Sequence, residues 1–472
     1  MSERLDADIC IIGAGSGGLS VAAGAAQLGQ RTVLIERGRM GGDCLNYGCV
    51  PSKSLIAAAE RAHVFCSSGA FGVEPVEPKV DMKAVREHVR SVIAAIAPHD
   101  SVERFEGLGV RVIQAHGRFA GVDEVEAGDV RIRARRFVIA TGSSPAIPPV
   151  PGLVDIDILT NETIFELDEL PDHLLVLGAG PIGCELAQAF CRLGSKVTAV
   201  DIGPMLARDD EDLRKTVRES LVRDGVTIRD SVKILRVEPG PAIVIEGAAG
   251  EEERIAGSHL LVATGRTPNI ADLGLDLAGI EHDRRGITVD ARLRTTNRRI
   301  FAIGDVTGRY PFTHMAGHHA GIVIRNALFR MPAKVKEDVV PWVTYTDPEL
   351  AQVGLSKAEA EARGVDHEIV ESHYAENDRA RAERATEGRI RLVVTRKGRV
   401  LGATIVGRQA GELVLPWSLA IQKGMKLSDV ASAIVPYPTL SEIGKRAAGS
   451  FYTPKLFSER TRCIVRWLGK LG

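Results

Sequence analysis

Two stretches of this sequence repeat one plan, and that repetition limits the fold more than any other feature. Each begins with an apolar run, turns through closely spaced glycines, continues as a helix and ends in a second apolar run that finishes on a carboxylate. The glycines and acids are Gly13, Gly15, Gly18 and Glu36 in the first stretch and Gly178, Gly180, Gly183 and Asp201 in the second. In both stretches the first glycine and the acid are 23 residues apart.

A glycine-rich turn between a strand and a helix, with an acid about 20 residues later, is typical of dinucleotide-binding folds. The glycines let the backbone turn tightly and approach a pyrophosphate at the positive end of the helix. The acid can accept hydrogen bonds from an adenosine ribose. Two such folds predict two dinucleotides, one held permanently and one that visits. Glycine-rich turns in some other α/β fold are the alternative.

Further motifs divide the chain into domains. Two strands end in Ala-Thr-Gly, at Thr141-Gly142 and at Thr264-Gly265, and a later strand ends at Asp305. After about residue 338, strand-like runs joined by short turns precede helical stretches, which indicates a mixed α+β domain. We therefore predict an α/β protein with a first dinucleotide-binding domain over 1–150 that returns at 271–338, a second over 151–270 and a C-terminal α+β domain over 339–472.

Composition excludes several classes of partner. The chain has 60 basic and 61 acidic side chains, so no long-range field would attract nucleic acid. No apolar run approaches the roughly 18 residues that span a bilayer. The first predicted strand begins almost at once after MSERLDAD, which leaves no room for a signal peptide. We expect a cytoplasmic protein without a nucleic-acid partner.

The cysteines point to redox chemistry. Seven cysteines in 472 residues form neither a secreted disulfide framework nor a zinc pattern, so we predict no resident metal site. Cys44 and Cys49 lie five apart, and in the cytoplasm such a pair is more often catalytic than structural. Pro51 suits the first turn of a helix, which places Cys49 near a helix N-terminus, where the dipole lowers a thiol pKa. Two inert core cysteines are the alternative.

Together these motifs resemble the class I pyridine nucleotide-disulfide oxidoreductases, a family that includes lipoamide dehydrogenase, glutathione reductase and mercuric reductase. The resemblance follows the family's motif order over nearly the whole chain and includes the segment GGDCLNYGCVPSKSL. It implies FAD on the first fold, NAD(P)H on the second, and a homodimer built through the C-terminal domain. Electrons would pass from the nicotinamide through the flavin to the Cys44–Cys49 disulfide, and on to a small disulfide, a metal ion or another oxidant.

The resemblance also implies roles for single residues. Cys44 matches the outer thiol that attacks substrate, and Cys49 matches the inner thiol that faces the flavin. Lys53 matches a lysine beside the flavin that pairs with Glu185. The other positions implied at FAD are Gly13, Gly15, Gly18, Glu36, Thr141, Gly142, Asp305 and His314, and those at NAD are Gly178, Gly180, Gly183, Asp201 and Gly265.

The sequence departs from the disulfide-reducing members near its C-terminus. Those members carry His-Pro-Thr-x-x-Glu, in which the histidine is the acid–base for thiol exchange and the glutamate orients it. Here Tyr437 replaces the histidine and Glu442 remains. An unperturbed tyrosine has a pKa near 10, against roughly 6.5 for histidine, so it is a poor base at pH 7. Mercuric reductases resemble this chain at the tyrosine, but they also carry adjacent cysteines near the C-terminus, where this chain has only Cys463.

Two other segments allow more than one interpretation. A histidine of PFTHMAGHHAG is a candidate replacement acid–base, although a supporting role beside the flavin is simpler; the three are His314, His318 and His319. The C-terminal tail places apolar side chains on one helical face and basic side chains on another, namely Ile464, Trp467, Leu468 and Leu471 against Arg462, Arg466 and Lys470. The tail suits a membrane surface, while docking against the protein's own dimer is the simpler interpretation.

Asp201 predicts NADH rather than NADPH, because a carboxylate accepts the ribose 2′-hydroxyl and repels a 2′-phosphate. No arginine occupies the next two positions, although Arg208 is near. Two other functions remain as alternatives to the main interpretation. One is a flavin reductase that passes electrons directly to quinones, and the other is a lipoamide dehydrogenase-like subunit of a larger complex.

Overall fold

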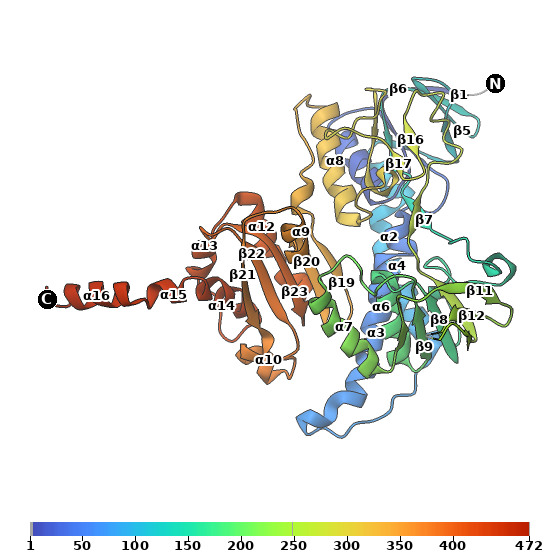
Figure 1. Cartoon of the computed structure of the whole chain (residues 1–472). Coiled ribbons are helices and arrows are strands. Elements are labelled where there is room, and N and C mark those ends of the chain that lie inside the picture. Colours follow the sequence, from blue (N-terminus) through green and yellow to red (C-terminus); the bar gives the residue numbers. More distant parts are fainter. Residues whose placement is uncertain (1–2, 248, 472) are drawn as a thin grey trace. The chain divides into compact units, whose positions relative to one another are not determined.

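The computed structural model describes residues 3–247 and 249–471 (Figure 1). The chain divides into two compact units. The first comprises the chain up to Ile202 together with Thr227–Val335, and the second comprises Gly203–Val226 together with the chain from Lys336 onward. Helix α7 (Glu211–Asp224) therefore belongs to the second unit, although the chain on both sides of it belongs to the first.

The first nucleotide-binding fold is built on a mixed sheet with the strand order β3-β2-β1-β6-β5-β4, and β18 also pairs with β6. The pairs among β1, β2, β3, β6 and β18 are parallel, whereas β4, β5 and β6 pair antiparallel. The strands are β1 (Glu3–Ile12), β2 (Thr32–Glu36), β3 (Val110–Gln114), β4 (Gly117–Phe119), β5 (Glu124–Ala127), β6 (Val130–Ile139) and β18 (Ile300–Ala302). The return of β18 to this sheet explains why the chain resumes the first fold after the second.

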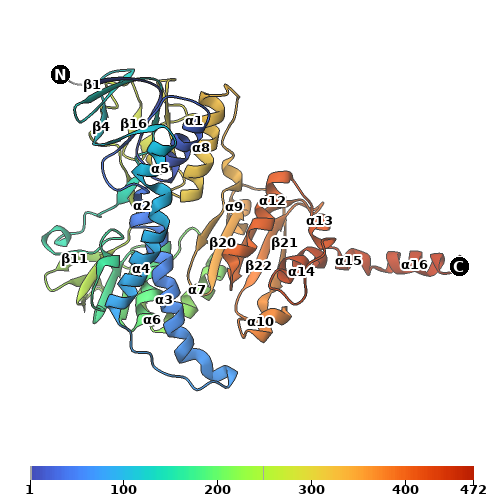
Figure 2. The same cartoon turned by 180° about the vertical axis from the view of Figure 1, so that it is seen from behind.

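Helices cover this sheet, and its apolar core is continuous. Helix α1 packs against α8, and Figure 2 shows α3 alongside α4. Ile9 and Ile11 on β1 and Phe137 on β6 are fully buried in the core, as expected for parallel strands covered on both faces. The helical elements are α1 (Ser16–Gln27), α2 (Gly42–Asn46), α3 (Cys49–Ser67), η1 (Ser68–Phe71), α4 (Met82–Ile96), η2 (Ala97–Asp100), α5 (Val102–Gly107), η5 (Gly304–Thr307) and α8 (Thr313–Ala327).

The second nucleotide-binding fold has a parallel sheet of order β10-β9-β8-β14, and its glycine turn leads into helix α6 (Pro181–Leu193). An antiparallel sheet, β11-β12-β13, shares its apolar core. The strands are β8 (His173–Leu177), β9 (Lys196–Val200), β10 (Thr227–Arg229), β11 (Ile234–Glu238), β12 (Ala242–Glu246), β13 (Glu252–Ala256) and β14 (His259–Val262). Smaller elements of the unit are β7 (Ser143–Pro145), η3 (Leu153–Asp155), η4 (Ile164–Glu166), β15 (Arg266–Pro268), β16 (His282–Asp283) and β17 (Gly286–Ile287).

The second unit is an α+β domain with the antiparallel strand order β19-β20-β23-β22-β21. Trp417 from α12 and Ile443 from α14 pack into its core with Ile390 and Ile405 of the sheet. Its strands are β19 (Trp342–Thr344), β20 (Glu349–Gly354), β21 (Glu368–His373), β22 (Arg389–Val394) and β23 (Val400–Gly407). Its further helices are η6 (Glu337–Val339), α9 (Lys357–Ala362), η7 (Tyr374–Glu376), α10 (Asp378–Ala382), α11 (Ala410–Leu413), α12 (Leu415–Lys423), α13 (Leu427–Ala431), α14 (Glu442–Ser450), α15 (Thr453–Leu456) and α16 (Glu459–Leu468).

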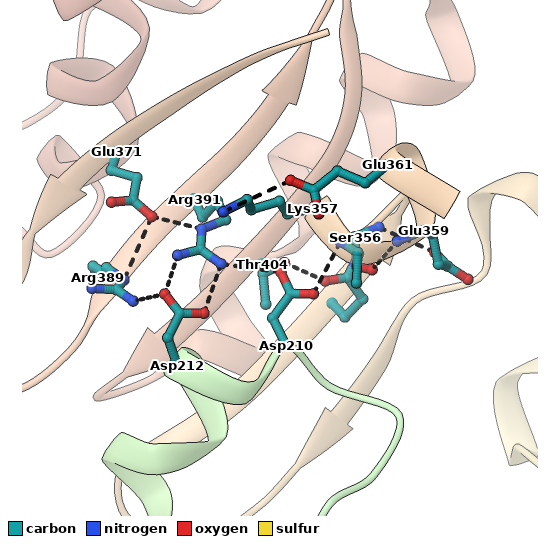
Figure 3. Close-up of polar contacts among 12 residues, drawn as sticks. Asp210, Asp212, Ser356, Lys357, Glu359, Glu361, Glu371, Arg389, Arg391 and Thr404 are labelled. Atoms are coloured by element: carbon teal, nitrogen blue, oxygen red, sulfur yellow. Dashed lines mark hydrogen bonds and ion pairs between the residues drawn. The ribbon is translucent and has the colours of Figure 1, made fainter. Parts of the chain in front are cut away.

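A buried ionic cluster binds α7 to the sheet of the second unit (Figure 3). The side chain of Arg391 on β22 is only 4% exposed. Its guanidinium donates to Asp210 Oδ2 at 3.1 Å, to Asp212 Oδ1 at 2.9 Å and to Glu371 Oε1 at 2.6 Å. Arg391 and Arg389 together hold the pKa of Asp212 below its usual range, mainly through the Arg391 hydrogen bond. Because a buried charge is tolerated only when it is paired, this cluster fixes the start of α7.

Candidate active site

The two cysteines of the predicted redox pair lie at the junction of two helices. Cys44 is in the short helix α2, and Cys49 is the first residue of α3, directly after Gly48. Pro51 follows within the first turn, so the position predicted for Cys49 at a helix N-terminus is found in the structure. The positive end of α3 therefore lies at the Cys49 sulfur, which favours its thiolate form.

The two thiols have different acidities. A hydrogen bond from the Cys44 thiol lowers the pKa of Cys49 to about 6; burial opposes this shift, and Thr313 and the Lys53 charge support it. The same hydrogen bond, with burial, raises the pKa of Cys44 well above its usual range. Thr313 Oγ1 at the start of α8 lies 3.4 Å from Cys49 Sγ. In the reduced pair, Cys49 therefore carries the negative charge at neutral pH and Cys44 keeps its proton.

Lys53 and Glu185 form an ion pair between the two nucleotide-binding folds of the first unit. Lys53 Nζ on α3 lies 2.6 Å from Glu185 Oε2 on α6. The glutamate side chain is 6% exposed, whereas that of the lysine is 36% exposed. This is the pairing that the family resemblance implies, and it places a positive charge one helical turn beyond Cys49.

A polar cluster joins the residue before Cys44 to Asp305, and sequence reasoning found only the aspartate. Ser143 Oγ donates to Asp305 Oδ2 at 2.6 Å, and Arg266 Nε donates to the same serine oxygen at 2.7 Å. Arg266 also pairs with Asp43 Oδ1 at 3.0 Å. Burial raises the pKa of Asp305 above its usual range. Arg266 directly follows the Thr264-Gly265 motif, and this position is the sequence signal that could have identified it as a site residue.

The first glycine turn fits the adenosine end of FAD. A Cβ on Gly18 would lie 1.8 Å from the Gly13 carbonyl oxygen, so only glycine permits this approach. Glu36 Oε2 accepts a hydrogen bond from Ala14 N at 2.6 Å, which holds the carboxylate against the turn. A pocket beside it is lined by residues that include Gly13, Glu36, His116 and Thr141. Gly15 caps α1, and Gly142 has a φ of +69° at the next strand end.

The second glycine turn repeats this geometry and fits a second dinucleotide. A Cβ on Gly183 would lie 1.9 Å from the Gly178 carbonyl oxygen. Asp201 Oδ2 accepts from Ala179 N at 2.6 Å, as Glu36 does in the first fold. Gly180 caps α6, and Gly265 has a φ of +138° beside the turn. Both predicted acids thus lie at the mouths of their turns, where an adenosine ribose would bind.

Tyr437 lies in the second unit, five residues before Glu442, which is the first residue of α14. The Tyr437 hydroxyl donates to Asp378 Oδ2 at 3.2 Å, and this hydrogen bond raises the pKa of the tyrosine above its usual range. The Tyr437 side chain is 70% exposed. Glu442 Oε2 accepts a long hydrogen bond from Thr439 N at 3.4 Å. Sequence reasoning did not find Asp378, whose hydrogen bond leaves still less of this tyrosine ionised at neutral pH.

The three histidines of α8 have different surroundings. His314 stacks on Phe312 with ring centroids 5.2 Å apart. His319 is buried, and its Nδ1 accepts a hydrogen bond from Gly304 N at 3.1 Å, beside Asp305. Burial lowers the pKa of His318. In the described residues, 3–247 and 249–471, no group of three His, Cys, Asp or Glu side chains is placed to hold a metal ion.

Comparison with known proteins agrees with this geometry. Residues 7–320 match the family model for pyridine nucleotide-disulphide oxidoreductase, and residues 340–448 match the model for the dimerisation domain of the same family. The chain belongs to this family. It is therefore an FAD-dependent oxidoreductase that uses NAD(P)H, and its dimerisation domain supports a homodimer. The predicted fold class, two nucleotide-binding domains and a C-terminal α+β domain, is confirmed.

Similar proteins include both metal and lipoamide enzymes. A mercuric reductase of Streptomyces lividans is 33% identical over 94% of this chain and 96% of its own length. A dihydrolipoyl dehydrogenase of Geobacillus stearothermophilus is 34% identical over 94% of this chain and 96% of its own length. A Cu(II) complex of the HOCl-induced flavoprotein disulfide reductase RclA of Escherichia coli has a TM-score of 0.83 at 27% identity, over 93% of this chain and 98% of that chain.

Proposed function

We propose that this family member takes electrons from NADH and delivers them through Cys44 and Cys49 to a thiophilic metal ion such as Hg(II) or Cu(II). The observation that carries the proposal is Tyr437, whose hydroxyl is bound to Asp378 and whose pKa is raised. Exchange between dithiol and disulfide needs a group that cycles a proton near neutral pH. Metal reduction needs thiolates as ligands, and the cysteines supply them.

The thiols are arranged for the binding of a soft cation. Cys49 is largely ionised above its pKa of about 6. The Cys44 proton lies on the hydrogen bond to Cys49, so a cation that binds both sulfurs displaces this proton to solvent. Soft thiolates prefer soft metal ions over Mg²⁺ or Ca²⁺. The pair therefore offers a two-sulfur site without help from a base.

The electron balance closes with the nicotinamide as reductant. Oxidation of NADH to NAD⁺ and a proton yields two electrons, which reduce one Hg(II) to Hg(0) or two Cu(II) to two Cu(I). FAD, when bound at the first fold, would supply the hydride acceptor between the nicotinamide and the cysteine pair. Lys53 and the helix dipole of α3 stabilise negative charge at Cys49 while this happens. Asp201 is proposed to favour NADH over NADPH at the second fold.

Similar proteins support this choice. Mercuric reductases are 33–34% identical to this chain, and the structural neighbour RclA is known in a Cu(II) complex. Dihydrolipoyl dehydrogenases are equally similar, so lipoamide is the second candidate acceptor. The cysteines form no pattern typical of a secreted disulfide framework, which favours the cytoplasm as the place of action.

Steady-state NADH oxidation by the purified holoenzyme distinguishes these acceptors. The panel is Hg(II), Cu(II), lipoamide, oxidised glutathione and a quinone, assayed without oxygen. We expect the metal ions to be turned over faster than either disulfide, and Cys44→Ser to abolish metal reduction while sparing quinone reduction. Cys463→Ser, which removes an exposed thiol outside the redox pair, is the control and should change nothing. Metal reduction that survives Cys44→Ser would contradict the proposal.

The tyrosine is tested separately. Tyr437→His places an acid–base group five residues before Glu442. We expect lipoamide turnover to rise by at least about tenfold, a lower bound set below the 10²–10⁴-fold that general acid–base catalysis typically supplies. Tyr437→Phe removes the hydroxyl without adding a base and should leave disulfide turnover slow. Wild-type protein that reduces lipoamide faster than the metal ions would overturn the assignment in favour of the second candidate.

A further inference from the structure

The last helices of the second unit lie outside the matched dimerisation domain. The family model ends at residue 448, whereas α15 and α16 follow at Thr453–Leu456 and Glu459–Leu468. Within the part of the chain that the structure describes, no residue of α16 is buried. Figures 1 and 2 both show α16 extending clear of the antiparallel sheet of its own unit. The apolar side chains of α16 therefore do not pack into the core of this unit.

The helix has a well-defined start. Ser458 Oγ accepts a hydrogen bond from Thr461 N at 3.3 Å and thus caps the helix. Thr461 Oγ1 donates to the Lys455 carbonyl oxygen at 2.9 Å, which ties α16 to α15. Arg462 pairs with Glu459 at 3.0 Å within the first turn. A cap and an internal ion pair stabilise a helix. The side chains of α16 therefore keep defined positions around it, and its faces can be compared.

The two faces of α16 are chemically distinct. The apolar face is highly exposed: Ile464 48%, Trp467 61%, Leu468 50% and, just beyond the helix, Leu471 68%. Arg462, Arg466 and Lys470 recur at every fourth position and form the other face. Over residues 455–471 there are five basic side chains and one acidic side chain, although the whole chain carries a net charge of −1. Positive charge is therefore concentrated at this tail.

We propose that α16 binds the surface of an anionic lipid bilayer, with Trp467 and its apolar neighbours in the headgroup boundary and the arginines on the lipid phosphates. Short amphipathic helices with basic polar faces and Trp or Leu on the other face bind in this way. Charge complementarity selects an anionic surface as the partner, because the tail carries five basic side chains and one acidic side chain over residues 455–471. No helix in the described ranges is long and apolar enough to cross a membrane, so the helix lies on the surface.

The dimer strengthens this attachment. A homodimer carries two such tails, and the second helix binds a surface to which the first is already attached. Binding of the tail to the membrane weakens as ionic strength rises, because exposed charges are screened over about 10 Å at 0.1 M salt. The proposal goes beyond the oxidoreductase activity and does not depend on which acceptor the enzyme uses.

Co-sedimentation of the full-length holoenzyme with vesicles tests the proposal. The probes are vesicles of phosphatidylglycerol and phosphatidylcholine in equal parts, and vesicles of phosphatidylcholine alone. We expect binding to the anionic vesicles that weakens as salt is raised, with a blue shift of Trp467 emission that the Trp467→Phe variant lacks. No binding to anionic vesicles at low salt would overturn the proposal.

Two double variants distinguish vesicle binding through the tail from nonspecific adsorption through other exposed apolar side chains. Trp467→Ser with Leu468→Ser should weaken vesicle binding by at least about tenfold and leave NADH oxidation unchanged. Val154→Ser with Leu277→Ser removes side chains that are 84% and 62% exposed elsewhere and should change neither. Equal binding by both double variants would refute the assignment. So would dissociation of the dimer in the tail variant by sedimentation velocity, because the helix would then cover a second copy of the chain.

Discussion

Replacement of Thr313 by valine should make the Cys49 thiol less acidic. The threonine hydroxyl lies 3.4 Å from the sulfur and favours its thiolate form, and valine has nearly the same shape but no hydroxyl. A hydrogen bond to a charged group contributes roughly 1.5–3 kcal/mol of stabilisation, and we take the low end of this range because the contact to sulfur is long. Because one pKa unit corresponds to about 1.4 kcal/mol, we expect the pKa of Cys49 to rise by about one unit.

The pH dependence follows from the sign of this shift. The wild-type thiol has a pKa of about 6 and is mostly thiolate at pH 6.5. A rise of about one unit lowers the thiolate fraction of Cys49 about threefold at that pH. It has almost no effect at pH 8, where Cys49 is largely ionised in both the wild type and the variant. The matched control is Thr313→Ser, which keeps the hydroxyl.

The measurement is the rate of iodoacetamide alkylation of Cys49 in the reduced enzyme between pH 5 and pH 9. A Cys44→Ser background would remove the main hydrogen bond to Cys49, so the native pair is used and the modified residue is identified by peptide mapping. An unchanged pKa in Thr313→Val, or an equal shift in Thr313→Ser, would refute the role of this hydroxyl.

Three further predictions concern the cofactor sites and the fold. Gly18→Ala should yield protein without bound flavin, measured by visible absorbance, while Gly317→Ala, where a Cβ meets nothing within 4 Å, should keep its flavin. NADH should exceed NADPH by at least about tenfold in kcat/KM, the order of one charged contact at Asp201, and equal rates would contradict this. Arg391→Met should cost about 3–5 kcal/mol in denaturant unfolding, because Asp210 is left buried without its partner; a loss below about 1 kcal/mol would show that the cluster does not hold the fold.

Features set by local chemistry could be predicted from the sequence. The glycine turns and the acids that end the following strands each lie within one strand–helix–strand segment, so spacing alone placed Glu36 and Asp201. Pro51 placed Cys49 at the start of a helix in the same way. Roles at a bound cofactor, such as those of His314 and Gly265, are implied by the resemblance and stay predictions.

Most contacts between distant segments could not be predicted, and the Lys53–Glu185 pair, 132 residues apart, was expected only through the family resemblance. Ser143 and Asp305 are 162 residues apart, and Asp378 and Tyr437 are 59 apart. No periodicity in the sequence marks such pairs, because each depends on how separate elements pack. The exposed apolar face of α16 was visible in the sequence, but only the structure shows that its own unit leaves it uncovered.

The membership of α7 in the second unit sets limits on how this protein can be cut or recombined. Its apolar residues Leu213, Val217 and Leu221 are buried, and Arg391 fixes its start from far along the chain. A fragment that ends near residue 335 would keep α7 but lose that partner, and would expose an apolar helix face to water. A chimera that exchanges C-terminal domains between relatives should therefore carry residues 203–226 with the domain. Sequence order alone would divide such a chimera in the wrong place.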